Sequence, residues 1–293
     1  MKKTSLHLVV TTLLLSTVTL CAEIKLSAVF GDHMVLQQGE PVPVWGSGEP
    51  GETIKVTFDG QTKSTKADDH GNWLILLDAL KANAKGQDLD VNDRTFRDIL
   101  IGEVWICSGQ SNMAWTVRGS ANPQEEAAAA NYPAIRHIRV PQVPSDRREK
   151  TFKGSWQVCT PQTAGNFTAV GYYFGRRLHK ELKVPIGLIN SSWGGTRIEP
   201  WIPMEGFELI KEQAFAKSTL DLIESVDPAT KKGRARHMAG IEAMRNWVEE
   251  AEKAVKAGNF PPKQPVAANI NLGNSHQSST RLYRGMIHPL VPF

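Results

Sequence analysis

The chain has 293 residues, 41% hydrophobic and 22% charged, which excludes a peptide hormone, a disulfide mini-scaffold and a broadly disordered protein. Its 34 basic and 30 acidic residues give a net charge of 34 − 30 = +4, and removing residues 1–22, which hold two lysines and no acid, leaves 32 − 30 = +2. This weak charge does not support a nucleic-acid partner.

The first 22 residues are predicted to be a secretory signal peptide. Two lysines precede an apolar run, Leu6–Leu20, and the small residue Ala22 follows it. The run is shorter than a comfortable membrane span, and a leucine directly before Cys21 does not fit a lipoprotein site. We therefore expect an exported protein, periplasmic or extracellular, with no membrane partner after cleavage.

Residues 23–98 contain short apolar runs separated by turn residues, with no helical period. Alternation over residues 53–58 places their apolar side chains on one face of a strand. The dipeptide Asp59-Gly60 that follows is a hairpin signal. This pattern predicts a small β-sandwich domain.

The pattern changes at Ile99. Residues 99–107 are nearly all apolar, as in a strand buried on both faces, and residues 135–140 form a second such run. A helical stripe over 169–183 leads directly into a short apolar strand at 186–189. A strand, a connection with a helix and another strand predict an α/β layer with a parallel sheet.

Residues 204–258 have a helical period. A helical excursion packed beside the α/β core explains them better than a lid or a partner-binding helix. The polar stretch 259–280 is predicted to be an exposed loop.

The cysteines and histidines give no sign of a cofactor. Without the signal peptide, Cys107 and Cys159 remain, and two buried thiols are favoured over a disulfide between them. The eight histidines are scattered without metal-ligand spacing. No metal or organic cofactor is expected.

Two loops follow the predicted parallel strands, where α/β sheets bind ligands. In Ser108–Met113, a serine lies in a glycine-containing turn between a strand and a helix, and the backbone amides at the start of the helix can stabilise an oxyanion. The serine can equally be a plain helix cap. In Asn190–Arg197, adjacent glycines let backbone N–H groups approach a ligand, although they can also make a tight turn. Two such loops at one sheet edge favour a binding or catalytic site.

Four segments resemble the sialate O-acetylesterase family, a branch of the SGNH hydrolases. Residues 101–113 resemble its nucleophile segment, and residues 190–201 (NSSWGGTRIEPW) resemble its second signature. Residues 30–37 are similar to the start of the preceding β domain, and residues 282–290 to the segment before the third signature. The resemblance implies a β-sandwich domain followed by an incomplete flavodoxin-like SGNH α/β domain over 99–293, with a helical insertion at about 204–258.

The resemblance also implies an activity and site residues. The family removes O-acetyl groups from sialic acid or another carbohydrate, so the expected partner is an O-acetylated sugar or glycan. By position, Ser111 is the nucleophile, and its amide and that of Gly195, with Gly194 less favoured, form the oxyanion hole. Candidate substrate-binding residues are Gln110, Asn112, Trp193, Thr196 and Arg197.

The chain departs from the family after His288. A Gln-Gly-Glu-Ser-Asn segment and a later Asp-x-x-His motif are expected there, but the sequence stops at Phe293, and none of its eight histidines follows an aspartate by three positions. No triad aspartate or histidine is assigned, and we expect a C-terminally truncated member with little activity alone. A non-catalytic carbohydrate-binding or scaffold protein and an acetylxylan-type esterase remain alternatives.

Overall fold

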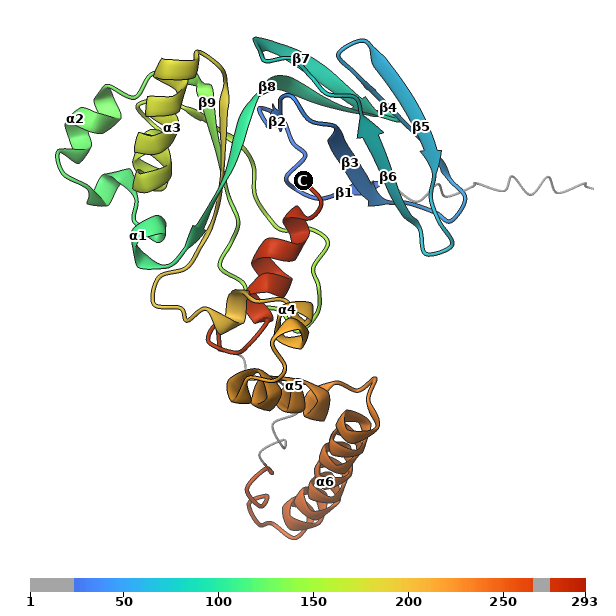
Figure 1. The fold of residues 1–293 in the computed structure, drawn as a ribbon. Coiled ribbons are helices and arrows are strands. Elements are labelled where there is room, and N and C mark those ends of the chain that lie inside the picture. The colour runs from blue at the N-terminus through green and yellow to red at the C-terminus, as the bar shows by residue number, and fades with distance from the viewer. Residues whose placement is uncertain (1–23, 266–274) are drawn as a thin grey trace, which may run out of the picture.

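The computed structural model describes residues 24–265 and 275–293 (Figure 1). The predicted signal peptide lies outside these ranges. Among the helices of the described residues, none is long and apolar enough to cross a membrane.

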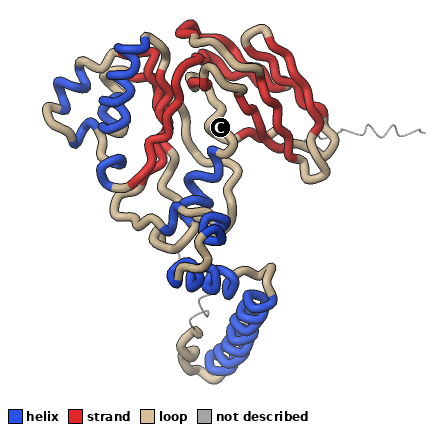
Figure 2. The backbone as a smooth tube through the Cα atoms, viewed as in Figure 1, coloured by secondary structure: helices blue, strands red, loops and turns tan. Residues whose placement is uncertain are grey.

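The first part of the chain forms two β-sheets over one apolar core (Figure 2). One sheet has the order β1-β3-β6, and in the other β5, β4, β7 and β8 are neighbours, with β2 also paired to β8. Val44 and Ile75 of the first sheet share the core with Val56 and Leu89 of the second. The strands are β1 (Lys25–Leu26), β2 (Val35–Gln37), β3 (Val42–Ser47), β4 (Thr53–Phe58), β5 (Gln61–Lys66), β6 (Asn72–Leu77), β7 (Asn83–Val91) and β8 (Arg94–Gly109).

The predicted hairpin is confirmed. Strands β4 and β5 are antiparallel, and Phe58 pairs with Gln61 across the two turn residues. Asp59 and Gly60 have φ angles of 48° and 75°, as a type I′ turn requires. The apolar residues of β4 are buried and face the core as the alternation predicts.

Strand β8 passes from the first part of the chain into the second without a break. Its first half pairs with β7 and β2, and residues 103–109 pair in parallel with β11 (Ile186–Ser192). The position between residues 98 and 99, where the sequence changes character, therefore lies inside a strand. Trp105 and Ile106 are 41% and 53% exposed, so the expected burial on both faces is wrong for this stretch.

The parallel sheet predicted for the second part is confirmed. Strands β9 (Tyr132–Arg139), β11 and β8 are neighbours and parallel, and β10 (Gln157–Cys159) adds an antiparallel edge. Helix α3 (Ala169–Leu182) contacts β11 and β9, as the helical stripe predicts. A Cβ placed on its Gly171 would lie 2.8 Å from Cys107 Sγ, so the missing side chain lets the helix lie close to β8.

Helices α5 (Ala214–Val226) and α6 (Lys231–Lys256) extend away from the sheets (Figure 1). Figure 1 shows α5 and α6 projecting from the sheets, so helices do form over the region where the sequence predicts them, but the expected packing beside the α/β core is wrong for α6. The last residues return to the core, where Phe293 makes edge contacts with Phe30 and Trp45. The further helices are α1 (Ser111–Ala114), α2 (Pro123–Ala128), α4 (Met204–Leu209), α5 (Ala214–Val226) and α6 (Lys231–Lys256), with short turns at η1 (Val117–Gly119), η2 (Ala164–Asn166), η3 (Glu199–Trp201), η4 (Tyr283–Ile287) and η5 (His288–Leu290).

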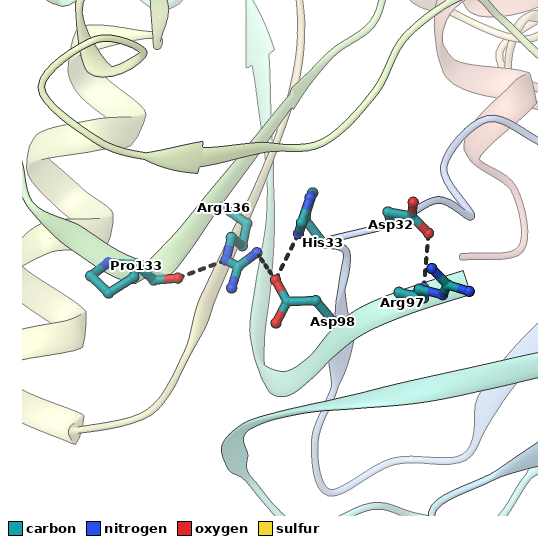
Figure 3. A network of polar contacts seen from close by, with 6 residues as sticks. All are labelled: Asp32, His33, Arg97, Asp98, Pro133 and Arg136. Atoms are coloured by element: carbon teal, nitrogen blue, oxygen red, sulfur yellow. Dashed lines mark hydrogen bonds and ion pairs between the residues drawn. The ribbon is translucent and has the colours of Figure 1, made fainter. Parts of the chain in front are cut away.

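A bulge in β8 places Asp98 between the two parts of the molecule (Figure 3). Phe96 pairs with Leu89 and Ile99 pairs with Gln87, so three steps along β8 match two steps along β7. Asp98 lies in this bulge and has a φ of 58°. Its carboxylate accepts a hydrogen bond of 2.7 Å from buried Arg136 and lies 2.6 Å from Nδ1 of His33. Partial burial acts to raise the pKa of Asp98, but these two hydrogen bonds outweigh it, and the pKa is lowered from 3.8.

Replacing the carboxylate tests this junction. We expect Asp98→Asn to lower the unfolding free energy at pH 7 by about 1–2 kcal/mol, limited by the partial exposure of the group. Since the folded pKa lies below the unfolded value, this stabilisation is present above pH 3.8 and is lost as the pH falls through the folded pKa. Urea denaturation from pH 7 downward should show the two proteins converging.

Asp78→Asn is the matched control, because Asp78 pairs with Lys63 at an exposed position. The assignment would be contradicted if Asp78→Asn lost as much unfolding free energy as Asp98→Asn, or if the difference between Asp98→Asn and wild type persisted in acid.

Both cysteines of the described residues are free and buried, which confirms the favoured interpretation. Burial raises the pKa of Cys107 to about 11, and burial likewise raises the pKa of Cys159 to about 11. Both are therefore protonated thiols at neutral pH, and thiolates are the reactive form.

A thiol assay tests this burial. In a Cys21→Ser chain at pH 8, we expect no reaction of native protein with 5,5′-dithiobis(2-nitrobenzoate), because both remaining thiols are buried and protonated. Unfolding in guanidinium chloride should release two reactive thiols. A thiol that titrates rapidly in the native protein would show that its site opens.

Candidate active site

Ser111 is the first residue of the one-turn helix α1, and only Gln110 separates it from the end of β8. Its side chain is exposed, and its carbonyl accepts a backbone hydrogen bond of 3.0 Å from Trp115. Gly109 ends the strand with a φ of 137°, a value that bulky residues avoid. The chain thus turns sharply out of the sheet and presents the serine at its edge.

The loop Asn190–Arg197, here called the glycine loop, lies beside Ser111. In the parallel ladder Ser192 pairs with Gly109, and the Trp193 amide donates a hydrogen bond of 3.0 Å to the Gly109 carbonyl. A Cβ placed on Gly194 would lie 3.5 Å from Ser111 Oγ, whereas one on Gly195 would meet nothing within 4 Å. The two loops that the sequence places at one sheet edge therefore do meet there.

Two candidate substrate-binding residues have partners inside the protein. The Thr196 hydroxyl donates to the Trp193 carbonyl at 2.8 Å and accepts from Trp201 Nε1 at 3.0 Å, so it closes the turn after the glycines. The Trp193 ring stacks on His276, with centroids 4.8 Å apart.

The other candidates stay close to solvent. Gln110 and Asn112 flank Ser111 and are exposed, and Asn112 lines a shallow depression with Trp115. Arg197 is exposed, and its guanidinium donates to the Gln277 carbonyl at 3.2 Å.

Residues 275–280 contact the glycine loop, and the sequence does not predict this. Gln277 Nε2 donates to the Gly195 carbonyl at 2.6 Å, and its Oε1 accepts from the Arg197 amide at 3.0 Å. Thr280 is fully buried, so the expected exposed loop over 259–280 is wrong at this end. A polar stretch without periodicity does not indicate which residues it contacts, and neither His276 nor Gln277 lies in one of the four segments that resemble the family.

The described residues provide no histidine hydrogen-bonded to Ser111. The nearby His276 lies 3.2 Å from Gln277 Nε2, and His288 Nδ1 is hydrogen-bonded to the Glu149 carbonyl at 2.9 Å. The described ranges also contain no group of three His, Cys, Asp or Glu residues that could hold a metal ion.

Comparisons with known proteins identify a matching family and a similar structure. Residues 101–241, which include both loops, match the family model for "Carbohydrate esterase, sialic acid-specific acetylesterase". A carbohydrate acetylesterase from Xanthomonas citri has a similar structure, with a TM-score of 0.65 and 29% identity over 92% of this chain and 49% of that one. The chain is thus similar to carbohydrate esterases in sequence and in fold.

Curated relatives make the assignment more specific. The rat sialate O-acetylesterase is 33% identical over 91% of this chain and 49% of its own length. The mouse sialate O-acetylesterase is 37% identical over 60% of this chain and 37% of its own length. The chain belongs to the sialate O-acetylesterase family. It spans about half the length of the rat protein.

The two glycines give a test of the loop geometry. Gly195 has a φ of 76°, so we expect Gly195→Ala to cost about 1–2 kcal/mol of stability through backbone strain. Gly194→Ala places its methyl at ordinary contact distance and should stay within about 0.5 kcal/mol of wild type. Both substitutions stiffen the unfolded chain alike, so urea denaturation isolates the strain. A larger loss in Gly194→Ala would refute this assignment.

Proposed function

We propose that this chain carries the nucleophile half of a serine carbohydrate O-acetylesterase that acts on sialic acid or a related sugar. The observation that supports it most is the close approach of Gly194 to Ser111 Oγ at the carboxyl ends of two parallel strands. Family membership supports the ester substrate.

In this proposal Ser111 Oγ attacks the acetyl carbonyl and forms an acetyl-enzyme, which water then hydrolyses to acetate. The Ser111 amide and the Gly195 amide stabilise the oxyanion, with Gly194 as the less favoured donor. Arg197 and Trp193 lie on the same loop and are the proposed contacts to the sugar. The reaction needs no metal or organic cofactor.

The fold assignment and cellular location are part of the same proposal. We take residues 23–98 as a β-sandwich domain and residues 99–293 as part of a flavodoxin-like SGNH domain, with β9, β11 and β8 as its parallel strands. A signal peptide over residues 1–22 would export the protein.

Since no histidine among the described residues is hydrogen-bonded to Ser111, we expect the 293-residue chain to hydrolyse acetyl esters close to the background rate. A positioned base contributes about 10²–10⁴-fold. Imidazole added to the solution can take its role at Ser111. We expect imidazole to raise hydrolysis of 4-nitrophenyl acetate by the chain above its own reaction with the ester.

Two variants control this rescue experiment. Ser111→Ala should show only the solution reaction of imidazole, whereas Ser108→Ala, which removes another exposed serine at the end of β8, should behave as wild type. Ser111-dependent hydrolysis without imidazole would show that the chain already has a base. Rescue that is equal in all three proteins would remove Ser111 as the nucleophile.

A further inference from the structure

A cavity of about 410 Å³ lies against the three-stranded sheet β1-β3-β6. Its walls come from that sheet, from Lys150 and Thr151, and from His288 and Pro292 near the end of the chain. Figure 1 shows this last segment reaching the first part of the molecule. The volume falls within the range of about 300–1,000 Å³ for small-molecule sites, and none of the esterase-site residues lines it.

One indole ring gives the cavity a flat apolar wall. Trp45 lines it and is held in place by edge contacts to Phe30 and Phe293, with ring centroids 4.7 Å and 6.1 Å away. A flat, fixed aromatic ring suits the C–H face of a sugar ring.

The charged groups of the cavity have one sign. Lys25 and Lys150 line it together with His288, and no acidic residue does in the described part of the chain. Lys150 Nζ donates to Asn72 Oδ1 at 2.8 Å, which holds the ammonium group at the cavity wall. His288 gives its Nδ1 hydrogen to the Glu149 carbonyl, so its Nε2 is left for a ligand. This surplus of positive charge favours an anionic ligand.

We propose that this cavity is a second binding site, which takes a pyranose sugar that carries a carboxylate, such as a uronic or sialic acid. The carboxylate pairs with Lys25 and Lys150, and the sugar ring lies against the Trp45 indole. The hydroxyl of Ser47 and the side-chain amide of Asn72 line the cavity and form hydrogen bonds to the hydroxyl groups of the sugar ring. The site is on the part of the chain that precedes the esterase loops, so it would bind a glycan without acting on it.

Calorimetric titration of the whole chain tests the proposal, with glucuronate and N-acetylneuraminate as probes. Glucose supplies the ring without the charge, and acetate supplies the charge without the ring. We expect the two sugar acids to bind at least about tenfold more tightly than either control, because charge-assisted hydrogen bonds add to ring contact. Added salt should weaken binding.

Variants locate the site. Lys25→Gln with Lys150→Gln should raise the Kd of the sugar acids about tenfold, and both side chains are exposed, so folding should be unaffected. Lys55→Gln removes the same charge from an exposed position outside the cavity and should bind as wild type. Ser111→Ala should also bind as wild type, which separates this site from the esterase proposal.

The outcomes are decisive. Absence of sugar-acid binding, equal binding of glucose, equal binding of acetate, or an unchanged Kd in the double lysine variant would each overturn the proposal. Weaker binding in Ser111→Ala would move the ligand to the esterase loops.

Discussion

Strand β8 is the constraint that the rest of the structure depends on. It runs from Arg94 to Gly109, about 50 Å of extended chain, and is hydrogen-bonded into the sheets of both parts of the molecule. Backbone ladders, rather than a linker, therefore set how the first part lies relative to Ser111. The Asp98 bulge adds a polar contact to β9 at the point where the strand passes between the two parts.

The candidate site depends on segments that come back from far along the chain. The Ser191 hydroxyl donates to the Met286 carbonyl at 2.9 Å, which ties the end of β11 to the returning segment. In the same way Ser27 donates to the Pro289 carbonyl at 2.7 Å. The glycine loop is thus held by β11 from one side and by residues 275–280 from the other.

The sequence predicts the elements whose signal is local. Alternation in residues 53–58, the Asp59-Gly60 turn and the stripe of α3 all depend on neighbours in sequence, and the structure has all three. The position of both loops at one edge also follows, because parallel strands end together.

Long-range contacts were not predictable. Gly102-Glu103 interrupts the apolar run of residues 99–107, and nothing nearby in the sequence shows that Gly102 makes room for the Pro185 carbonyl, which accepts from the Glu103 amide at 2.9 Å. The exposure of Trp105 and Ile106 depends on which strands lie beside β8, and composition does not encode this. Gln277 gives no local sign of its partners 80 residues away.

The Gln277 side chain forms hydrogen bonds to the backbone of the glycine loop, as the backbone of a neighbouring strand does in a β-sheet. Its side-chain amide gives one hydrogen bond to a backbone carbonyl and accepts one from a backbone amide two residues further on, as a peptide group would. A carboxylate cannot give the first bond, and an alkyl chain can make neither. A stretch that reads as a freely variable surface loop therefore carries one position where substitution is restricted, and a change there is transmitted to the residues beside Ser111.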